Sequence, residues 1–453
     1  MKKVMMFALT LFASIMIIPT TYALGDDVTT NEVTYVASVG GNNYETVQEA
    51  INNENGQTVT LLTDVTESVT ISNGTTVTLD LGSYTLTNEN GEHTITNNGN
   101  LTVIGSGTVD NVSHAKAAVL NQGTFTLEGP TLIRSKEAGV QGSNGNNSWY
   151  VVDNNGGIFY MQSGKIESTS RYSSCIRNLE ATFYMNGGEL VSDFITLKND
   201  DNGTIYMNGG TISTNAEGGS GIQNWGTLEF RGGTVNAVEG AASIYTLSWS
   251  DDYKKPTTFI DDNAIINGTI LIEIDNSYQG TKYPELTIDG GKITGNIIDR
   301  VGTKIVINGG QIIGNIFPAE DSNLEIKAAD YSKVKELVDK VKTIDSTLYT
   351  EESWKILDNI IQNIDYSKNF LDQADVNDMA LAIENAIKGL VKVEEPDVEK
   401  PDVDFPDFPN VDLPENEVKD EEVNPKTSDS ISYAYIALFI SGIGMLISLK
   451  KLA

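Results

Sequence analysis

Two pairs of adjacent aspartates are the residues of this chain whose types and spacing could support acid–base chemistry. Asp200 and Asp201 form one pair, and Asp251 and Asp252 form the other. Two carboxyl groups can supply one proton donor and one proton acceptor, as glycoside hydrolysis requires. The basic residues that could act as partners are Arg171, Arg177, Lys254 and Lys255. Because adjacent carboxylates on a turn are usually only solvated, and acid is abundant throughout the chain, we assign no catalytic residue.

Aromatic side chains in two long segments favour binding over catalysis. The segments read GSNGNNSWYVVDNN and SWSDDYKKP, and they interrupt an otherwise regular pattern. Exposed aromatic rings supply large contact areas for sugars or protein partners. Trp225, in IQNWGTL, is instead expected to pack against the side of the fold, and Tyr172 is a weaker candidate. The predicted ligand-contact residues are Trp149, Tyr150, Trp249, Asp251, Asp252 and Tyr253.

Charge and cysteine content exclude several classes of function. The chain has 62 acidic and 30 basic residues, a net charge of −32, which disfavours nucleic acid as a partner. A single cysteine, Cys175, rules out an internal disulfide framework. With only His93 and His114 available to activate a thiol, we expect Cys175 to be a small buried residue. We expect no cofactor and no metal site.

Both ends of the chain carry apolar segments. Lys2 and Lys3 precede an apolar run, and small residues before a cut after Ala23 are typical of a signal peptide. An uncleaved membrane anchor is the alternative, although the run is short. Residues 431–449 carry no charge and are just long enough to cross a bilayer. The Lys-Lys tail that follows should stay in the cytoplasm, which places the intervening chain outside the cell.

A short motif stands before the second apolar segment. It reads Asn424-Pro425-Lys426-Thr427-Ser428. The order of motif, apolar span and basic tail resembles the cell-wall sorting signal of Gram-positive surface proteins (LPXTG-like, here NPKTS). The resemblance implies that a sortase cuts after Thr427 and links its carbonyl to peptidoglycan. The family usually has Leu where Asn424 stands and Gly where Ser428 stands, and a plain single-span membrane protein is the alternative.

The elements that must position these residues are repeats. Related segments such as FYMNGGEL, IYMNGGTI and LEFRGGTV recur along the chain. The last glycine of each segment stands at 164, 188, 210, 233, 291 and 310. The first intervals are 24, 22 and 23 residues, a degenerate copy at Asn263 divides the next gap into 30 and 28, and the last is 19. Looser copies extend the series upstream. Such a period indicates a stacked repeat architecture.

Each repeat alternates as a strand does. Ile205 and Met207 should point inward with Ile212, and Gly209-Gly210 should form the turn between two strands. About three short strands fit in a repeat, and only stacking can bury their apolar sides. We therefore predict a mainly β fold, a parallel β-solenoid. It resembles the right-handed single-stranded β-helix of the pectate-lyase-like superfamily, some of whose members cleave acidic polysaccharides.

The flanking segments differ in pattern. Val47, Ala50 and Ile51 share one face of a predicted short helix that should cap the β-helix. Residues 329–390 have helical periodicity and predict a three-helix bundle; YTEESW and VNDMALAIENAIKGL resemble the FIVAR-type spacer of Gram-positive surface proteins. The predicted helix faces are Val334, Leu337, Val338 and Val341; Trp354, Leu357, Ile361 and Ile364; and Met379, Ile383, Ala386 and Ile387. Proline and acid in the segment before the NPKTS motif predict a stiff, disordered stalk.

The sequence thus predicts a modular secreted protein. Its parts are a signal peptide (1–23), an N-terminal extension and cap (24–72), a β-helix (73–325), a three-helix bundle (326–392), a stalk (393–423) and a sorting region (424–453). The favoured hypothesis is a wall-anchored, adhesin-like protein, held by the membrane before sorting, that binds a glycan or matrix protein through its β-helix loops. The alternatives are a secreted polysaccharide lyase or hydrolase and a passive structural spacer or coat protein.

Overall fold

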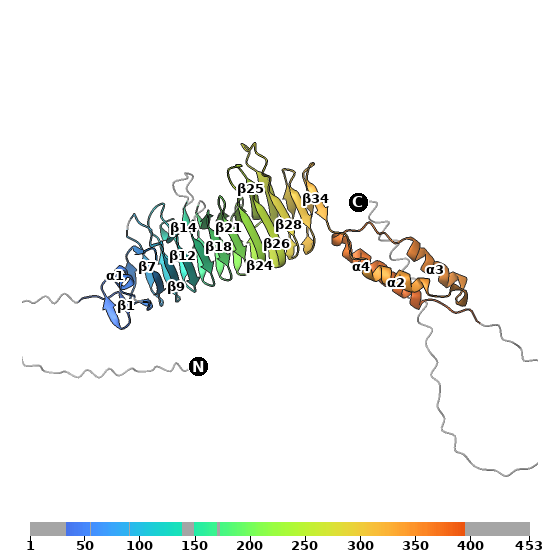
Figure 1. Cartoon of the computed structure of the whole chain (residues 1–453), viewed down its shortest axis with the longest axis horizontal. Coiled ribbons are helices and arrows are strands. Elements are labelled where there is room, and N and C mark those ends of the chain that lie inside the picture. The colour runs from blue at the N-terminus through green and yellow to red at the C-terminus, as the bar shows by residue number, and fades with distance from the viewer. Residues whose placement is uncertain (1–32, 55, 90, 138–148, 170–172, 395–453) are drawn as a thin grey trace, which may run out of the picture. The chain divides into compact units, whose positions relative to one another are not determined.

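The structure is a computed structural model that describes residues 33–54, 56–89, 91–137, 149–169 and 173–394. The predicted signal peptide, the stalk from residue 395 on, the NPKTS motif and the C-terminal apolar segment lie outside these residues. Within the described ranges, no helix combines the length and the apolar character needed to cross a bilayer. The described chain is mainly β and ends in a few helices, as predicted (Figure 1).

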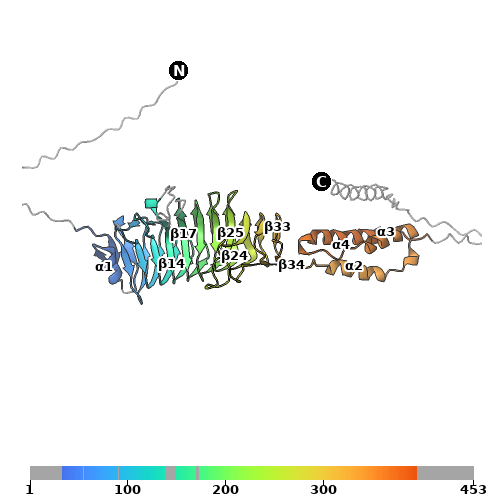
Figure 2. The same ribbon diagram turned by 90° about the horizontal axis from the view of Figure 1, so that it is seen from above.

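Most of the described chain forms a right-handed parallel β-helix with three faces. The first face is an 11-stranded sheet. Its strands are β5 (Val69–Ile71), β8 (Ile95–Asn97), β11 (Val119–Asn121), β14 (Tyr150–Asn155), β17 (Ser174–Leu179), β20 (Ile195–Asn199), β23 (Ser220–Asn224), β25 (Ala242–Ser248), β27 (Thr269–Ile274), β30 (Ile297–Asp299) and β33 (Ile316–Phe317). Figure 2 shows β17, β25 and β33 of this sheet from above.

The other two faces share the long strands β24 (Thr227–Ala237) and β26 (Thr257–Asn267). The second face also contains β3 (Val59–Leu61), β6 (Thr76–Asp80), β9 (Asn100–Ile104), β12 (Thr124–Glu128), β15 (Ile158–Met161), β18 (Thr182–Met185), β21 (Thr204–Met207), β28 (Glu285–Ile288), β31 (Lys304–Ile307) and β34 (Asn323–Ile326). The third contains β4 (Val65–Thr66), β7 (Thr85–Thr87), β10 (Thr108–Asp110), β13 (Thr131–Ile133), β16 (Lys165–Ser168), β19 (Glu189–Ser192), β22 (Thr211–Thr214), β29 (Lys292–Thr294) and β32 (Gln311–Ile313).

Strand register reproduces the spacing of the glycines. Thr182 pairs with Thr204, and Thr204 pairs with Thr227, so the intervals of 22 and 23 residues are single coils of the helix. The degenerate copy aligns one residue differently from the prediction, because Asn263 pairs with Gly232 after a register shift in which β26 has one more residue than β24. Strand β3 already pairs in parallel with β6, so the stacked coils begin before residue 73.

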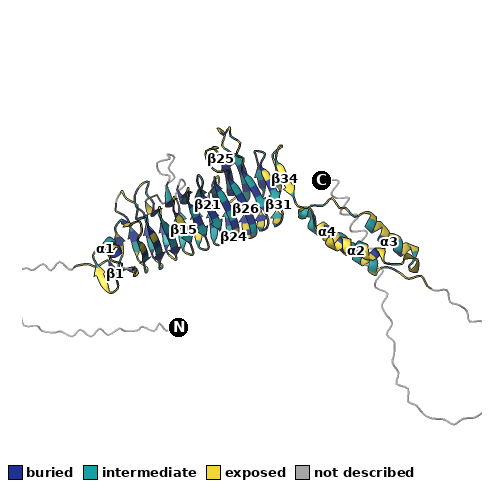
Figure 3. Cartoon of the chain, in the orientation of Figure 1, coloured by how far each residue is buried: buried dark blue, intermediate teal, exposed yellow. Residues whose placement is uncertain are grey.

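Like residues stack in rows inside the helix. Buried and less buried residues alternate along the strands of the helix (Figure 3). Ile205, Met207 and Ile212 are fully buried, as the alternation predicted. Phe125, Phe159 and Phe183 form an inner aromatic stack with ring centroids 4.7 and 4.9 Å apart. A second inner row consists of amide side chains that hydrogen-bond to one another along the stack: Asn97, Asn121, Asn154, Asn178, Asn199 and Asn224. These rows fix the register of the coils, and the register positions the outward side chains.

The N-terminal end of the stack is closed by β1 (Ala37–Val39), β2 (Asn42–Tyr44) and α1 (Val47–Asn52). Strands β1 and β2 form an antiparallel pair, and β1 also pairs with β3. Thr46 caps α1 by accepting a hydrogen bond from the Glu49 backbone N–H. Val47, Ala50 and Ile51 are buried on the inner side of α1, which confirms the predicted apolar face.

The C-terminal helices form a separate apolar core. The helices are α2 (Ser332–Lys342), α3 (Glu351–Gln362) and α4 (Gln373–Lys388), with the 3-10 helices η3 (Ser346–Leu348) and η4 (Phe370–Asp372) between them. Another 3-10 helix, η1 (Ser135–Glu137), follows β13 in the β-helix. All three predicted apolar faces contribute to one cluster, around the buried Leu337, Leu357 and Ile383. The prediction of three packed helices is therefore confirmed.

Candidate functional site

Outward side chains of the first face, between β14 and β25, form the most chemically distinctive surface of the described chain. We call this surface the strip, and its members are Trp149, Tyr150, Asp153, Arg177, Lys198, Asp200, Asp201, Trp225, Trp249 and Tyr253. Strand register aligns Asp153 with Arg177, and Arg177 with Lys198. Each of these residues immediately precedes an asparagine of the buried amide row. Because successive side chains of a strand point to opposite faces, the side chains of Asp153, Arg177 and Lys198 point outward.

The centre of the strip is a charged cluster around Asp200. The Asp200 carboxylate accepts a hydrogen bond from Arg177 Nε at 2.9 Å and lies 3.3 Å from Lys198 Nζ. Asp200 is 4% exposed, so these charge interactions are only weakly screened by solvent. The Arg177 guanidinium also lies 5.4 Å from the centroid of the Tyr150 ring. Burial, more than any neighbouring charge, raises the pKa of Tyr150 to about 12, so this ring is neutral at physiological pH.

Three aromatic rings form one end of the strip. Lys198 Nζ lies 4.4 Å from the centroid of the Trp225 ring, and the Trp249 ring lies 5.8 Å from Trp225 between centroids. Trp249 in turn lies 5.1 Å from Tyr253. The Trp249 indole N–H donates to Asp201 Oδ1 at 2.9 Å, which fixes the ring while leaving 38% of the residue exposed. Ordered, partly exposed aromatic faces are suited to contact with the C–H faces of sugars.

Contacts from both sides hold the loop 249–256 against the helix. The Lys254 backbone N–H donates to Asn202 Oδ1 at 2.9 Å. The Asp251 carboxylate accepts hydrogen bonds from the backbone N–H groups of Thr281 and Lys282 and from the Tyr278 hydroxyl. The hydrogen bond from Tyr278, followed by those from the backbone, holds the pKa of Asp251 below its ordinary value. Asp251 therefore serves to anchor the loop.

Asp153 differs from the other carboxyl groups of the strip. It is 4% exposed, and among the described residues its Oδ1 atom has no hydrogen-bond partner. The pKa of Asp153 is raised to about 6, mainly by burial; the Arg177 charge opposes the shift and the Asp200 charge adds to it. The indole N–H groups of Trp149 and Trp225 likewise lack partners within the described part of the chain. Unused hydrogen-bonding capacity is thus concentrated in the strip.

The strip brings together some of the residues predicted from the sequence and leaves others apart. Trp249 and Tyr253 form one end of it, and Trp149 lies 5.8 Å from Tyr150 at the other. Asp252 is exposed, and its carboxylate accepts a hydrogen bond from the Ser250 hydroxyl.

The basic residues predicted as partners of the aspartates do not lie together. Lys255 forms an ion pair with Glu285, outside the strip, and Arg171 lies outside the described residues. Arg177 belongs to the strip.

Asp153 and Lys198 escaped the sequence-based prediction. A signal for them was present, because the dipeptides Asp153-Asn154, Arg177-Asn178 and Lys198-Asn199 recur once in each coil. Aligning the repeats on these asparagines, as well as on the glycine turns, would have placed the three side chains in one outward column.

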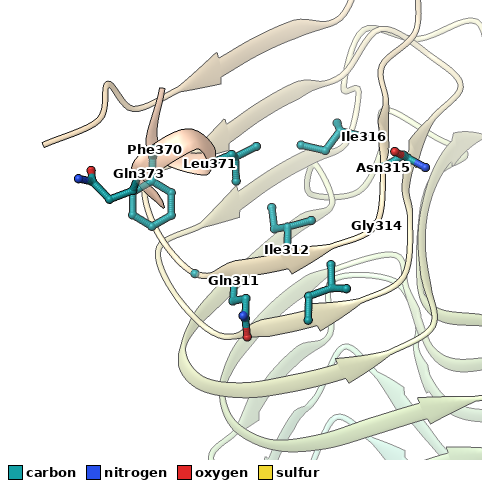
Figure 4. Close-up of a pocket in the computed structure, with 10 residues that line it drawn as sticks. Gln311, Ile312, Gly314, Asn315, Ile316, Phe370, Leu371 and Gln373 are labelled. Atoms are coloured by element: carbon teal, nitrogen blue, oxygen red, sulfur yellow. The ribbon is translucent and has the colours of Figure 1, made fainter. Parts of the chain in front are cut away.

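A separate cavity of about 610 Å³ lies beside the last coil of the helix, where η4 approaches β32 (Figure 4). Its lining includes the apolar side chains Ile312, Ile316, Phe370 and Leu371 together with Gln311, Asn315 and Gln373. Lys327 O accepts a hydrogen bond from the Phe370 backbone N–H at 2.7 Å, which holds η4 in this position. No charged side chain of the described residues lines the cavity, and the polar groups that line it are three amides.

The chemistry open to the strip is that of the side chains themselves. Among the described residues, no group of three or more histidine, cysteine, aspartate or glutamate side chains is arranged to hold a metal ion. Aromatic faces, two cations and three carboxyl groups can together bind a polar ligand with apolar faces, and two carboxyl groups in different protonation states can transfer protons. No protein family, curated protein or solved structure matches the chain.

Proposed function

We propose that the chain is an adhesin-like surface protein that a sortase links to peptidoglycan through Thr427 and that binds a glycan along the strip. The sequence supports the location through its signal peptide, its NPKTS motif and its C-terminal apolar segment. The helices that follow the β-helix, and the stalk after them, would separate the strip from the wall. A matrix protein is the alternative ligand.

The observation that carries the glycan proposal is the ordered aromatic cluster of Trp225, Trp249 and Tyr253. An exposed tryptophan costs little to desolvate, and the hydrogen bond to Asp201 limits the rotamer entropy that binding would otherwise remove. Hydrogen-bonding groups surround the cluster at Asp201 and Lys198. Alternating apolar and polar contacts of this kind match the two faces and the equatorial hydroxyls of a pyranose ring.

A binding experiment tests the proposal directly. The full chain, purified in mild detergent, is applied to an array of glycans and matrix proteins, together with Trp249→Ala. We expect retention on one glycan class and a loss of roughly tenfold or more in affinity for the variant, as for a central aromatic contact. Tyr366→Ala is the matched control, because Tyr366 is an exposed aromatic residue of the helical region. Equal binding by Trp249→Ala and the wild type would contradict the proposed site.

A cell-fractionation experiment tests the proposed location. Intact cells should release the wild-type chain attached to wall fragments after peptidoglycan digestion. Thr427→Ala should shift the chain to the membrane fraction, because the sortase would no longer recognise the residue whose backbone carbonyl it transfers. Recovery of the wild type in the membrane fraction alone would contradict wall anchoring.

A glycoside hydrolase is the second candidate, and Asp153 is the observation that favours it. A carboxyl group with a pKa of about 6, close to a second carboxyl group that is stabilised by two cations, resembles the division of roles between acid and base. Reducing-end release from a glycan panel, lost in both Asp153→Asn and Asp200→Asn, would support hydrolysis. Binding without turnover would favour the adhesin-like protein, and silence of every strip variant would favour a passive spacer.

A further inference from the structure

The aromatic end of the strip has two neighbouring rings that solvent can reach. Trp249 is 38% exposed, Tyr253 is partly exposed, and their ring centroids lie 5.1 Å apart with an angle of 32° between the rings. The indole N–H of Trp249 donates to Asp201 Oδ1, which fixes the orientation of that ring. A ligand can therefore contact an ordered aromatic surface here directly from solvent.

This surface lies where strands of the first face end. Asp201 follows β20 and Trp249 follows β25, and the strands of this sheet are parallel. The undescribed residues that adjoin this face in the sequence, 138–148 and 170–172, come before β14 and β17. Trp249 and Asp201 are thus at the opposite ends of the strands from the points where those segments join the sheet.

The fold itself contains an ammonium group that is bound by an aromatic ring and a carboxylate. The Lys198 ammonium lies 4.4 Å from the centroid of the Trp225 ring and 3.3 Å from the Asp200 carboxylate. Trp249 and the Asp201 carboxylate repeat the combination of ring and carboxylate. In the described part of the chain, neither the Trp249 ring nor the Tyr253 ring has a lysine or arginine positioned over it.

The charges around these two rings are mainly negative. The charge of Asp201, followed by burial and then by the charges of Asp252 and Glu180, raises the pKa of Tyr253 above its ordinary value. This direction holds although the exposed Lys254 follows Tyr253 in the sequence. Charges that disfavour a tyrosinate favour a cation at the same place. The net charge of −32 for the whole chain adds a long-range attraction of cations and a repulsion of polyanions.

The exposure of the rings favours one type of cation. A primary ammonium group is a compact, strongly hydrated charge, and it loses hydrogen bonds to water when it packs on a ring face. A quaternary ammonium group has no N–H donor and is covered by methyl groups. Its contact with Trp249 and Tyr253 therefore combines the attraction of a cation to the rings with the burial of apolar surface.

We propose that Trp249 and Tyr253, assisted by the charge of Asp201, bind a quaternary ammonium group, so that the glycan bound along the strip carries such a group on one of its sugars. This inference rests on the proposed glycan-binding function and specifies the chemical class of the ligand. The methyl groups pack against the two rings. Asp201 balances the positive charge, and its hydrogen bond from Trp249 keeps the carboxylate beside the aromatic surface.

The test uses choline as the probe, together with its neutral carbon analogue, in which a tert-butyl group replaces the trimethylammonium group. The full chain, with its tryptophans labelled for NMR and in a mild detergent without quaternary ammonium groups, is titrated at pH 7. We expect choline to shift the indole N–H signal of Trp249 saturably, with an affinity roughly tenfold or more above that of the analogue. Trp249→Phe identifies this signal, and the signal of Trp354, in the helical region, should not move.

Asp201→Asn separates the charge from the hydrogen bond, because asparagine can still accept from the Trp249 indole N–H. It should weaken choline binding by about threefold or more and leave binding of the neutral analogue nearly unchanged. Asp289→Asn is the matched control, since Asp289 is exposed after β28 and also accepts a side-chain hydrogen bond, from Asn308 at 2.8 Å. It should bind choline as the wild type does, and equal losses in both variants would indicate general charge attraction and overturn the site.

The remaining outcomes separate this inference from the proposed function. Equal affinities for choline and its analogue, or no saturable shift of the Trp249 signal, would overturn the ammonium site. Glycan binding that is lost in Trp249→Ala would then still support the glycan-binding strip. Saturable choline binding without retention of any glycan would support the ammonium site and overturn the proposed glycan ligand. The two probes are compared on the wild type, so the inference stays testable if Asp201→Asn folds poorly.

Discussion

The carboxyl groups of the first face differ in how much of their hydrogen-bonding capacity the fold already uses. Asp251 accepts hydrogen bonds from two backbone N–H groups and a tyrosine, and Asp200 interacts with two cations. Asp153 keeps one oxygen without a partner among the described residues. Asp251 therefore has little hydrogen-bonding capacity left for a ligand, whereas Asp153 is a carboxyl group whose capacity the described residues leave partly unused.

The raised pKa of Asp153 predicts a pH dependence of stability. Its folded-state pKa of about 6 lies above the ordinary value of 3.8, so the folded chain binds the proton more tightly than the unfolded chain does. The stabilising contribution of protonated Asp153 is complete below about pH 4 and is lost as the pH rises through about 6. Relative to Asp153→Asn, the wild type should therefore lose at most about 3 kcal/mol between pH 4 and pH 7. Denaturant unfolding of both chains at the two pH values measures this difference.

The control for this measurement is Asp252→Asn, whose stability relative to the wild type should change little over the same pH interval because Asp252 is exposed. A wild type that gains stability relative to Asp153→Asn as the pH rises would show that the folded state favours the ionised carboxylate.

The sequence was enough to select candidate site residues by residue type, but it could not select those that are distinguished by their burial. Trp249 and Tyr253 could be selected because large aromatic residues in a long loop are unusual. Asp153 could not be separated from the many other acidic residues, because its distinguishing properties are its burial and its missing partner. Both arise from neighbouring coils that lie far apart in the sequence.

At the scale of single elements, buried polar rows fix the register that the strip requires. Asn178 donates from Nδ2 to Asn199 Oδ1 at 2.9 Å and to the carbonyl oxygens of Ala181 and Thr204, each at 3.1 Å. It also accepts a hydrogen bond from Asn154 at 2.7 Å. A shift of one coil relative to the next would break these hydrogen bonds, which are made by the residues that directly follow Arg177 and Lys198. The amide row therefore fixes the position of the charged cluster.

Replacement of Asn178 by alanine should destabilise the β-helix by roughly 2–4 kcal/mol, because it leaves several buried groups without partners. Asn186→Ala is the matched control, since Asn186 belongs to an exposed outer amide row, where it donates to Gln162 at 3.1 Å and accepts from Asn208 at 2.9 Å. Its cost should stay below about 1 kcal/mol. Urea unfolding of both variants measures the difference, and equal costs would show that the buried row contributes no more than a surface contact.

The glycine turns allow a second test of an element. Gly210 has a φ of +82°, and a Cβ atom there would lie 2.6 Å from Met185 Cε and 2.8 Å from Gly188 O. Gly218 has a similar φ of +74° but open space around the Cβ position. Gly210→Ala should therefore cost more than Gly218→Ala, by about 1 kcal/mol or more, because it adds a steric clash to the backbone strain that both share. Comparable melting temperatures would mean that the stacked coils can move apart without cost.

At the scale of the whole molecule, the repeat period was enough to predict the stacked architecture. Segments such as IYMNGGTI carry the turn and the inward residues together, so each repeat independently indicates the same coil. The point at which stacking begins was less evident, because β3 to β5 lack the Gly-Gly turn, although β3 already pairs with β6. Strand pairing is made by backbone N–H and C=O groups, which almost every residue carries. A sequence therefore reveals pairing only where side chains repeat in a recognisable pattern.

An open end of a parallel stack exposes unpaired backbone groups and core residues, and α1 protects the first coil from association with another molecule. Ile51 of α1 is 2% exposed, so Ile51→Asp should detach the helix from the stack and promote end-to-end association of the full chain. Light scattering at increasing protein concentration should show a rising apparent mass for this variant alone. Asn52→Asp introduces the same charge at the exposed neighbouring position and should behave as the wild type. If Ile51→Asp lost stability but scattered like the wild type at every concentration, α1 would contribute packing energy without protecting the end of the stack.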